Sequence, residues 1–201
     1  MQDIIEAGSN HLSIAAPETQ ASVWAGLLRR GVGVFLTKAV SVRDFMTKVL
    51  GMDVQYAINS VPGLFLNNSP VDDWAAEIVG DGDAVGMSGT MPGLCGIALR
   101  RSSPIKAFRP DLLSKQERAH SGGVATLKMF NFVATDCFRP ILGQGVVVRA
   151  DALGDFLDDQ DMRLDDCVCT WNGTPVSGAE IRRLLDRADG GVVLSVKVIE
   201  T

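Results

Sequence analysis

The sequence has few of the features that mark nucleic-acid-binding or membrane proteins. Its 19 lysines and arginines are outnumbered by 24 aspartates and glutamates, which gives a net charge of -5 and an isoelectric point near 5.0. Non-specific nucleic-acid binding needs a cationic surface, and the aromatic residues that stack on bases make up only 6% of the chain. No stretch approaches the roughly 20 apolar residues that cross a bilayer. We therefore expect neither a nucleic acid nor a membrane as partner.

Signals for secretion and for metal binding are also missing. The first residues, 1–6, lack the basic start and unbroken apolar run of a signal peptide, so we expect a soluble cytoplasmic protein. The four cysteines form no Cys-x-x-Cys pair, and neither His11 nor His120 has a second ligand beside it. The aspartates between residues 155 and 166 lack the ligand order of an EF-hand. We expect reduced, unbridged thiols, no metal and no cofactor.

The chain does contain enough apolar residues, 46%, for a packed core, and they fall in short segments of two periodicities. Spacing, caps and turn residues predict an α+β fold. The predicted helices are 17–30, 41–50 (capped by Ser41), 151–157 (capped by Asp151) and 177–185 (capped by Ser177), with a short helix or turn at 74–79. The predicted strands are 32–36, 55–58, 63–66, 84–88, 124–134, 145–149, 167–171 and 192–199.

Chain-breaking residues cluster between residues 102 and 123, where Pro104, Pro110 and Gly122-Gly123 interrupt any regular pattern. Residues 111–119 in that segment could form one exposed helix. We predict two small mixed modules, one over 1–101 and one over 124–201, joined by the irregular connection 102–123.

Two segments repeat one pattern at a spacing of 105 residues. Leu66-Asn67-Asn68-Ser69-Pro70-Val71 corresponds to Trp171-Asn172-Gly173-Thr174-Pro175-Val176, and each is followed by a helical stretch, a glycine turn and a strand. Asparagine, glycine and proline are good turn residues in any context. The pattern is therefore consistent with duplication and with convergence.

The stretch from residue 41 to 96 resembles a β-grasp module of the ubiquitin-like sulfur-carrier type. The matching features are the helix 41–50, the turn and strand start Asp81-Gly82-Asp83-Ala84-Val85, and the glycine-rich continuation 86–96. In that family a strand leads to a helix, then to an extended segment, and the last strand ends in a glycine tail. Carriers end in a free Gly-Gly carboxylate, whereas this chain continues for a hundred residues, and the first hairpin of the family is not evident. The resemblance therefore implies the fold and not the carrier function.

The stretch from residue 164 to 198 resembles the C-terminal half of a PDZ domain, in which a strand and an Asn-Gly turn precede a helix and a final strand. The matching residues are Asp166, Val168, Asn172, Gly173, Pro175, Val176, Leu184 and Leu185. The resemblance implies peptide binding at a sheet edge beside a glycine-containing carboxylate loop, for which Gly143-Gln144-Gly145-Val146 is the candidate. An ordinary α+β domain with a well-formed turn explains the same residues.

The best candidate for a ligand site is the glycine-rich stretch 86–101. Glycines let backbone N–H groups approach an anion, and two adjacent arginines follow. The spacing matches neither the phosphate-binding loop of nucleotide hydrolases nor the dinucleotide fingerprint, and a glycine-rich crossover with solvated arginines fits as well. The candidate ligand-binding residues are Gly86, Ser88, Gly89, Thr90, Gly93, Cys95, Gly96, Arg100 and Arg101.

Catalysis has only one weak candidate, a Cys95 nucleophile with His120 as its base. Two classes of function remain. The first is a non-enzymatic binding or scaffold protein with a protein or peptide partner. The second is a small-anion-binding protein or an enzyme that uses the 86–101 loop.

Overall fold

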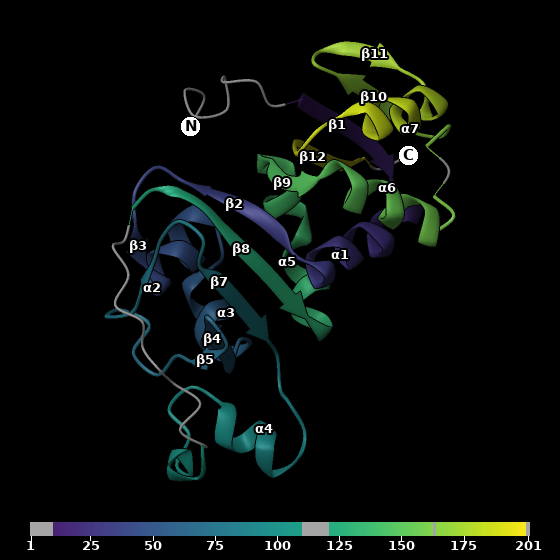
Figure 1. The fold of residues 1–201 in the computed structure, drawn as a ribbon. Coiled ribbons are helices and arrows are strands. Elements are labelled where there is room, and N and C mark those ends of the chain that lie inside the picture. The colour runs from purple at the N-terminus through teal and green to yellow at the C-terminus, as the bar shows by residue number, and fades with distance from the viewer. Residues whose placement is uncertain (1–9, 110–120, 163, 200–201) are drawn as a thin grey trace. The chain divides into compact units, whose positions relative to one another are not determined.

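The computed structural model describes residues 10–109, 121–162 and 164–199, which fold into two units that both mix helices and strands (Figure 1). The predicted α+β class is therefore confirmed. Unit 1 combines the chain up to Leu27 with the chain from Phe138 onward, and unit 2 is Leu28–Cys137. The unit boundaries differ from the predicted modules, because β1 (Asn10–Pro17) pairs along its whole length with β12 (Gly191–Ile199).

Unit 2 contains a mixed sheet in the order β2-β8-β7-β4-β5. Strands β7 and β8 are parallel neighbours, whereas the other pairs in this order are antiparallel. The elements are β2 (Val32–Leu36), β3 (Val40–Ser41), α2 (Val42–Asp44), η2 (Phe45–Val49), α3 (Val54–Asn59), β4 (Gly63–Leu66), β5 (Ser69–Pro70), β6 (Ile78–Val79), β7 (Ala84–Ser88), α4 (Gly93–Leu99), η3 (Lys106–Phe108), β8 (Gly123–Phe130) and the start of α5 (Asn131–Gln144).

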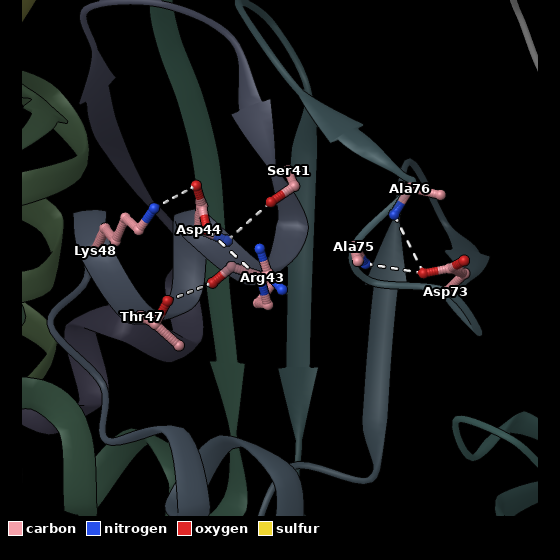
Figure 2. A network of polar contacts seen from close by, with 8 residues as sticks. All are labelled: Ser41, Arg43, Asp44, Thr47, Lys48, Asp73, Ala75 and Ala76. Carbon is pink, nitrogen blue, oxygen red and sulfur yellow. Dashed lines mark hydrogen bonds and ion pairs between the residues drawn. The ribbon is translucent and has the colours of Figure 1, made fainter.

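The helix that begins after Ser41 packs into the core of unit 2, as the sequence predicted. Ser41 Oγ accepts a hydrogen bond from Asp44 N–H at 3.1 Å, and Lys48 Nζ donates to Asp44 Oδ2 at 2.8 Å (Figure 2). Thr47 Oγ1 donates back to Arg43 O at 2.8 Å. The predicted Ser41 cap is thus confirmed, and satisfying the first turn's free N–H groups is what makes serine a good cap.

The neighbouring turn at residues 73–76 is fixed by its own aspartate and is joined to this helix. Asp73 Oδ1 accepts hydrogen bonds from the N–H groups of Ala75 and Ala76 at 3.0 and 3.2 Å (Figure 2). Arg43 N–H donates to Trp74 O at 2.8 Å. Of the two predicted forms of segment 74–79, the structure has the turn, followed by the short strand β6.

Two predicted strands of unit 2 are wrong in whole or in part. Residues 55–58 lie in helix α3, which is capped by Asp53, whose Oδ1 accepts a hydrogen bond from Tyr56 N–H at 2.9 Å. The strand predicted over 124–134 ends at Phe130, because Asn131 adopts a φ of 49° and turns the chain into α5. Short apolar runs fit a strand or a buried helix equally well, so periodicity alone cannot separate them.

Unit 1 has the strand order β11-β10-β1-β12-β9, again with one parallel pair, β1 and β12. Helices α6 and α7 contact each other and bury their apolar faces. The elements are β1, η1 (Glu18–Gln20), α1 (Ala21–Arg30), the end of α5, β9 (Val146–Arg149), α6 (Ala150–Asp159), β10 (Val168–Trp171), β11 (Thr174–Val176), α7 (Gly178–Arg187) and β12.

Of the two helix caps predicted in unit 1, one is confirmed and one is wrong. Ser177 and Glu180 form a reciprocal capping box at the start of α7. Helix α6 is present, but Arg149 rather than Asp151 is its N-cap residue, and Asp151 lies in the first turn paired with the Arg149 side chain.

The repeated Asn-containing segments form equivalent hairpins in the two units. Strands β4 and β10 lie 105 residues apart, and each turns tightly into the short edge strand that follows. Both central turn residues have positive φ in each case: 50° and 67° at Asn67 and Asn68, and 50° and 80° at Asn172 and Gly173. This is the turn type whose twist matches a hairpin, and the predicted positive φ of Gly173 is confirmed.

The first asparagine of each turn also binds a central strand. In unit 2, Asn67 N–H donates to Ala84 O at 2.8 Å, Ala84 N–H donates to Asn67 Oδ1 at 2.9 Å, and Asn67 Nδ2 donates to Asp83 Oδ1 at 2.8 Å. These three bonds fix the start of β7 against the hairpin.

In unit 1, Asn172 repeats all three contacts on β1. Its N–H donates to His11 O at 2.8 Å, His11 N–H donates to Asn172 Oδ1 at 2.8 Å, and Asn172 Nδ2 donates to Asn10 Oδ1 at 3.3 Å. Strand β1 therefore occupies the place in unit 1 that β7 occupies in unit 2, and β12 corresponds to β8. In the chain, however, the strands that follow the two hairpins are β7 and β12, and these take different places in the strand order, so the repeat stays consistent with duplication and with convergence.

Replacing Gly173 with valine should lower the free energy of unfolding by about 1 kcal/mol or more. No atom lies within 4 Å of the position that a Cβ would occupy, so the cost comes from forcing a β-branched residue to a φ of 80°. Urea denaturation followed by circular dichroism measures the loss. Gly173→Asn is the matched control and should be nearly neutral, because Asn68 occupies the equivalent position at a φ of 67°. Equal stability of the valine variant and the wild type would contradict the positive φ assigned to Gly173 in this turn.

Candidate functional site

The glycine-rich stretch begins inside a strand and continues into a short helix. Gly86 and Ser88 belong to β7, which ends where the loop residues 89–92 start, and α4 follows directly. Ser88 Oγ accepts a hydrogen bond from Asn131 Nδ2 at 3.0 Å, and Gly89 N–H donates to Asn131 Oδ1 at 3.0 Å. The backbone donor of Gly89 is therefore satisfied within the protein instead of facing an anion.

Three of the glycines fit places where a side chain would clash or where the backbone conformation favours glycine. A Cβ on Gly89 would overlap the ring of Phe132, and a Cβ on Gly96 would overlap the backbone of Met91. Gly93 starts α4 at a φ of 74°, which L-residues with side chains rarely adopt. These glycines let α4 approach the loop before it, a structural role that the sequence alone does not distinguish from a role in ligand binding.

Arg101 holds the end of helix α3. Its Nη2 donates to Ala57 O at 3.2 Å and to Ile58 O at 3.1 Å, and its guanidinium lies 4.6 Å from the centre of the Trp74 ring. A cation at a helix C-terminus compensates the carbonyl groups that have no helical partner. Burial lowers the pKa of Arg101.

Arg109 fixes the C-terminal end of α4, and sequence reasoning missed it. Its Nη1 and Nη2 donate to the two carboxylate oxygens of Asp72 at 2.8 and 3.0 Å, while its Nε donates to Ala98 O at 2.8 Å. The paired hydrogen bonds from Arg109 hold the pKa of Asp72 below its usual range. Only the positive charge of Arg109 was visible in the sequence, because Asp72 lies 37 positions away.

Two guanidinium atoms of the predicted anion site have no partner among the described residues. Arg100 Nε and Arg101 Nη1 are buried without a hydrogen bond. Both atoms are shielded from solvent, so an anion could reach them only if the surrounding side chains moved.

The other predicted site residues lie apart from these arginines or outside the described ranges. Thr90 and Cys95 are exposed, and His120 falls in the segment 110–120, outside the described residues. The pairing of Cys95 with His120 stays a prediction. The loop proposed for carboxylate binding is wrong: Gly143 and Gln144 form the last turn of α5, and Gly145 N–H donates to Leu142 O at 3.3 Å. A helix C-terminus presents carbonyl oxygens, which repel a carboxylate.

The four thiols are free and differ in their surroundings. Cys95 is exposed, Cys167 is half-buried and donates to Gln20 Oε1 at 3.4 Å, and Cys137 and Cys169 are buried. Burial raises the pKa of Cys137 and of Cys167, and it raises the pKa of Cys169 to about 11. A raised thiol pKa lowers the fraction of reactive thiolate at neutral pH.

Cys95 should be the first cysteine to react with iodoacetamide near pH 8. A thiol whose pKa is raised from 9.0 to about 11, as at Cys169, has roughly a hundredfold less thiolate at that pH. Time-resolved peptide mass spectrometry of the native protein measures the order of labelling. In denaturant and without reductant, all four cysteines should react at similar rates, which controls for a hidden disulfide. Labelling of native Cys169 as fast as Cys95 would contradict the burial.

Helix α4 exposes two of its three large apolar side chains and buries two of its small residues. Leu94 and Ile97 are 77% and 36% exposed and Cys95 is exposed, whereas Gly96 and Ala98 are buried. A surface helix ordinarily turns its large apolar residues toward the core. The reversed pattern cannot be relieved by rotating the helix, because Gly96 lies directly against the Met91 backbone.

Searches for metal sites, for membrane-spanning helices and for similar proteins do not add to the description of the site. Within the described ranges, histidine, cysteine, aspartate and glutamate form no cluster of three or more that could hold a metal ion. No helix in these ranges is both long enough and apolar enough to cross a membrane. No protein-family model, no curated protein and no solved structure matches the chain.

Proposed function

We propose that this chain is a non-enzymatic binding or scaffold protein whose partner is another protein. The observation that carries the proposal is the reversed arrangement of α4, with Leu94, Cys95 and Ile97 outward and small residues inward. Apolar side chains grouped on a surface are typical of interaction sites. Of the two arginines that the sequence placed in the anion-binding loop, Arg101 contributes instead to the fold, because it donates to the end of α3.

The two family resemblances support a pair of small binding modules. In unit 2 a strand, a helix, a hairpin and the strand β7 follow one another, as in a β-grasp module. Strand β8 lies between β2 and β7 and supplies, from later in the chain, the strand that the missing first hairpin would provide. In unit 1 the order β10, β11, α7 and β12 agrees with the C-terminal half of a PDZ domain.

A small-anion-binding protein, or an enzyme using the loop 86–101 with Cys95, is the second candidate function. The unpaired Arg100 Nε and Arg101 Nη1 favour it, because guanidinium donors bind carboxylate or phosphate groups well. Such a ligand would have to open the loop to reach these buried atoms.

A thermal-shift screen of carboxylate- and phosphate-containing metabolites separates the two functions. A ligand at a hundred times its dissociation constant stabilises the folded state by about 2.7 kcal/mol, which raises the melting temperature measurably. We expect no such shift. A shift that disappears in Arg100→Ala would overturn the scaffold function in favour of the second candidate. Arg101 is left intact because it caps α3.

The binding function itself is tested by affinity capture with a matched variant. Leu94→Asp should lose a protein that the wild type retains, while both proteins melt at the same temperature because Leu94 is 77% exposed. Retention of the same proteins by wild type and variant would place the binding surface elsewhere.

A further inference from the structure

The segment that contains α4 is exclusively cationic. Residues 89–109 include Arg100, Arg101, Lys106 and Arg109 and no aspartate or glutamate. Arg109 is neutralised by Asp72, and Arg101 is held at the end of α3. Lys106 is exposed, and its short helix η3 contacts α4. The charged residues that follow Leu94 and Ile97, the apolar ridge of α4, in this segment are thus all cationic.

The ridge has the geometry of a helix-packing surface. Leu94 and Ile97 are three positions apart, so they lie on the same face of α4. The backbone N–H and C=O groups of a helix are mostly bonded within it, so α4 offers no edge to which a partner could add a strand. Packing of side chains against another helix remains the available mode.

We infer that α4, together with Arg100 and Lys106 that follow it in the chain, docks an acidic amphipathic helix of a partner protein. This inference rests on the proposed binding function and specifies its partner. The partner helix would place apolar side chains on Leu94 and Ile97 and carboxylates beside the two cations. A lipid surface fits less well, since α4 has only seven residues and only Leu94 and Ile97 of them are exposed large apolar ones.

A phage-displayed library of random peptides, long enough to form a helix and selected on the full chain, tests the inference. Enriched peptides should be acidic and should carry apolar residues three or four positions apart. Fluorescence anisotropy should show at least tenfold weaker binding to Leu94→Asp/Ile97→Asp, and weaker, less salt-dependent binding to Arg100→Glu/Lys106→Glu. Val168→Asp is the matched control, because Val168 is an exposed apolar residue of unit 1 at 68%. Leu94→Ser, which removes the apolar side chain without adding a charge, is a second variant beside the aspartate substitutions.

Several outcomes would overturn the inference. Basic or uncharged binders, binders insensitive to the α4 variants, or the absence of any α4-dependent binder would each do so. Two further results would also overturn it. Sedimentation with phosphatidylserine vesicles that depends on Leu94 would show that the ridge binds a bilayer. Dimerisation that depends on Leu94, measured by sedimentation velocity, would show that it binds a second copy of the chain. Peptides that bind a different surface would contradict this inference but not the proposed binding function. A metabolite that raises the melting temperature in an Arg100-dependent way, together with the absence of any peptide binder, would contradict both the inference and the binding function.

Discussion

Replacing Asp83 with alanine should lower the free energy of unfolding by about 2–3 kcal/mol, since a buried donor left without a partner costs about 1–3 kcal/mol and a second hydrogen bond is lost with it. The Asp83 carboxylate is 2% exposed, accepts Gly80 N–H at 2.8 Å on Oδ2, and accepts Asn67 Nδ2 at 2.8 Å on Oδ1. The alanine variant leaves the Gly80 N–H buried without an acceptor, whereas water can reach the amide of the exposed Asn67. Losing the Asn67 contact also loosens the hairpin against β7.

Urea denaturation measures this effect, and Asp81→Ala provides the comparison in the same turn. Asp81 Oδ1 accepts Val124 N–H at 2.8 Å, but the residue is exposed, so water can replace the lost acceptor. We therefore expect the Asp81 variant to lose less stability than the Asp83 variant. Equal losses, or a loss below about 1 kcal/mol at Asp83, would show that its carboxylate does not hold the turn.

Replacing Trp24 with alanine should cost about 3–5 kcal/mol, the range for removing a large buried aromatic side chain. Trp24 is fully buried in α1, and its ring centre lies 5.9 Å from that of Phe156 with the planes tilted by 45°. Alanine would leave a cavity at the centre of unit 1 and remove this aromatic contact.

Trp24→Phe is the informative companion variant. The indole Nε1 of Trp24 is buried without a hydrogen-bond partner among the described residues, so phenylalanine removes an unsatisfied donor together with some volume. We expect phenylalanine to recover most of the stability that alanine loses, as measured by urea denaturation. A phenylalanine variant as unstable as the alanine variant would mean that the Nε1–H group makes a stabilising contact in solution.

Features that depend on a few neighbouring residues were predictable from the sequence. The Ser41 and Ser177 caps, the Asn172-Gly173 turn and most of the strands were placed correctly, because caps and tight turns are decided by hydrogen bonds and φ values within about four residues. The internal spacing of 105 residues was also visible, since the hairpins at its two ends use the same turn chemistry.

Features that depend on distant partners were decided by the tertiary structure. Residues 55–58 and 131–134 are helical although their composition suits a strand. The end of α3 is held by Arg101, 43 and 44 positions away, and Asn131 at the start of α5 donates to Ser88, 43 positions away. The placement of β1 beside β12 and of β8 between β2 and β7 joins residues far apart in sequence, which no local pattern specifies.

The candidate site divides in the same way. Its glycines and arginines were evident in the sequence, but their roles were not, since Arg101 contacts residues 43 and 44 positions away. The outward direction of Leu94 and Ile97 follows from the contact of Gly96 with Met91, which composition cannot reveal. The sequence by itself determined the local elements and the chemistry available at the site. Only long-range packing decided which of these groups hold the fold together and which are exposed.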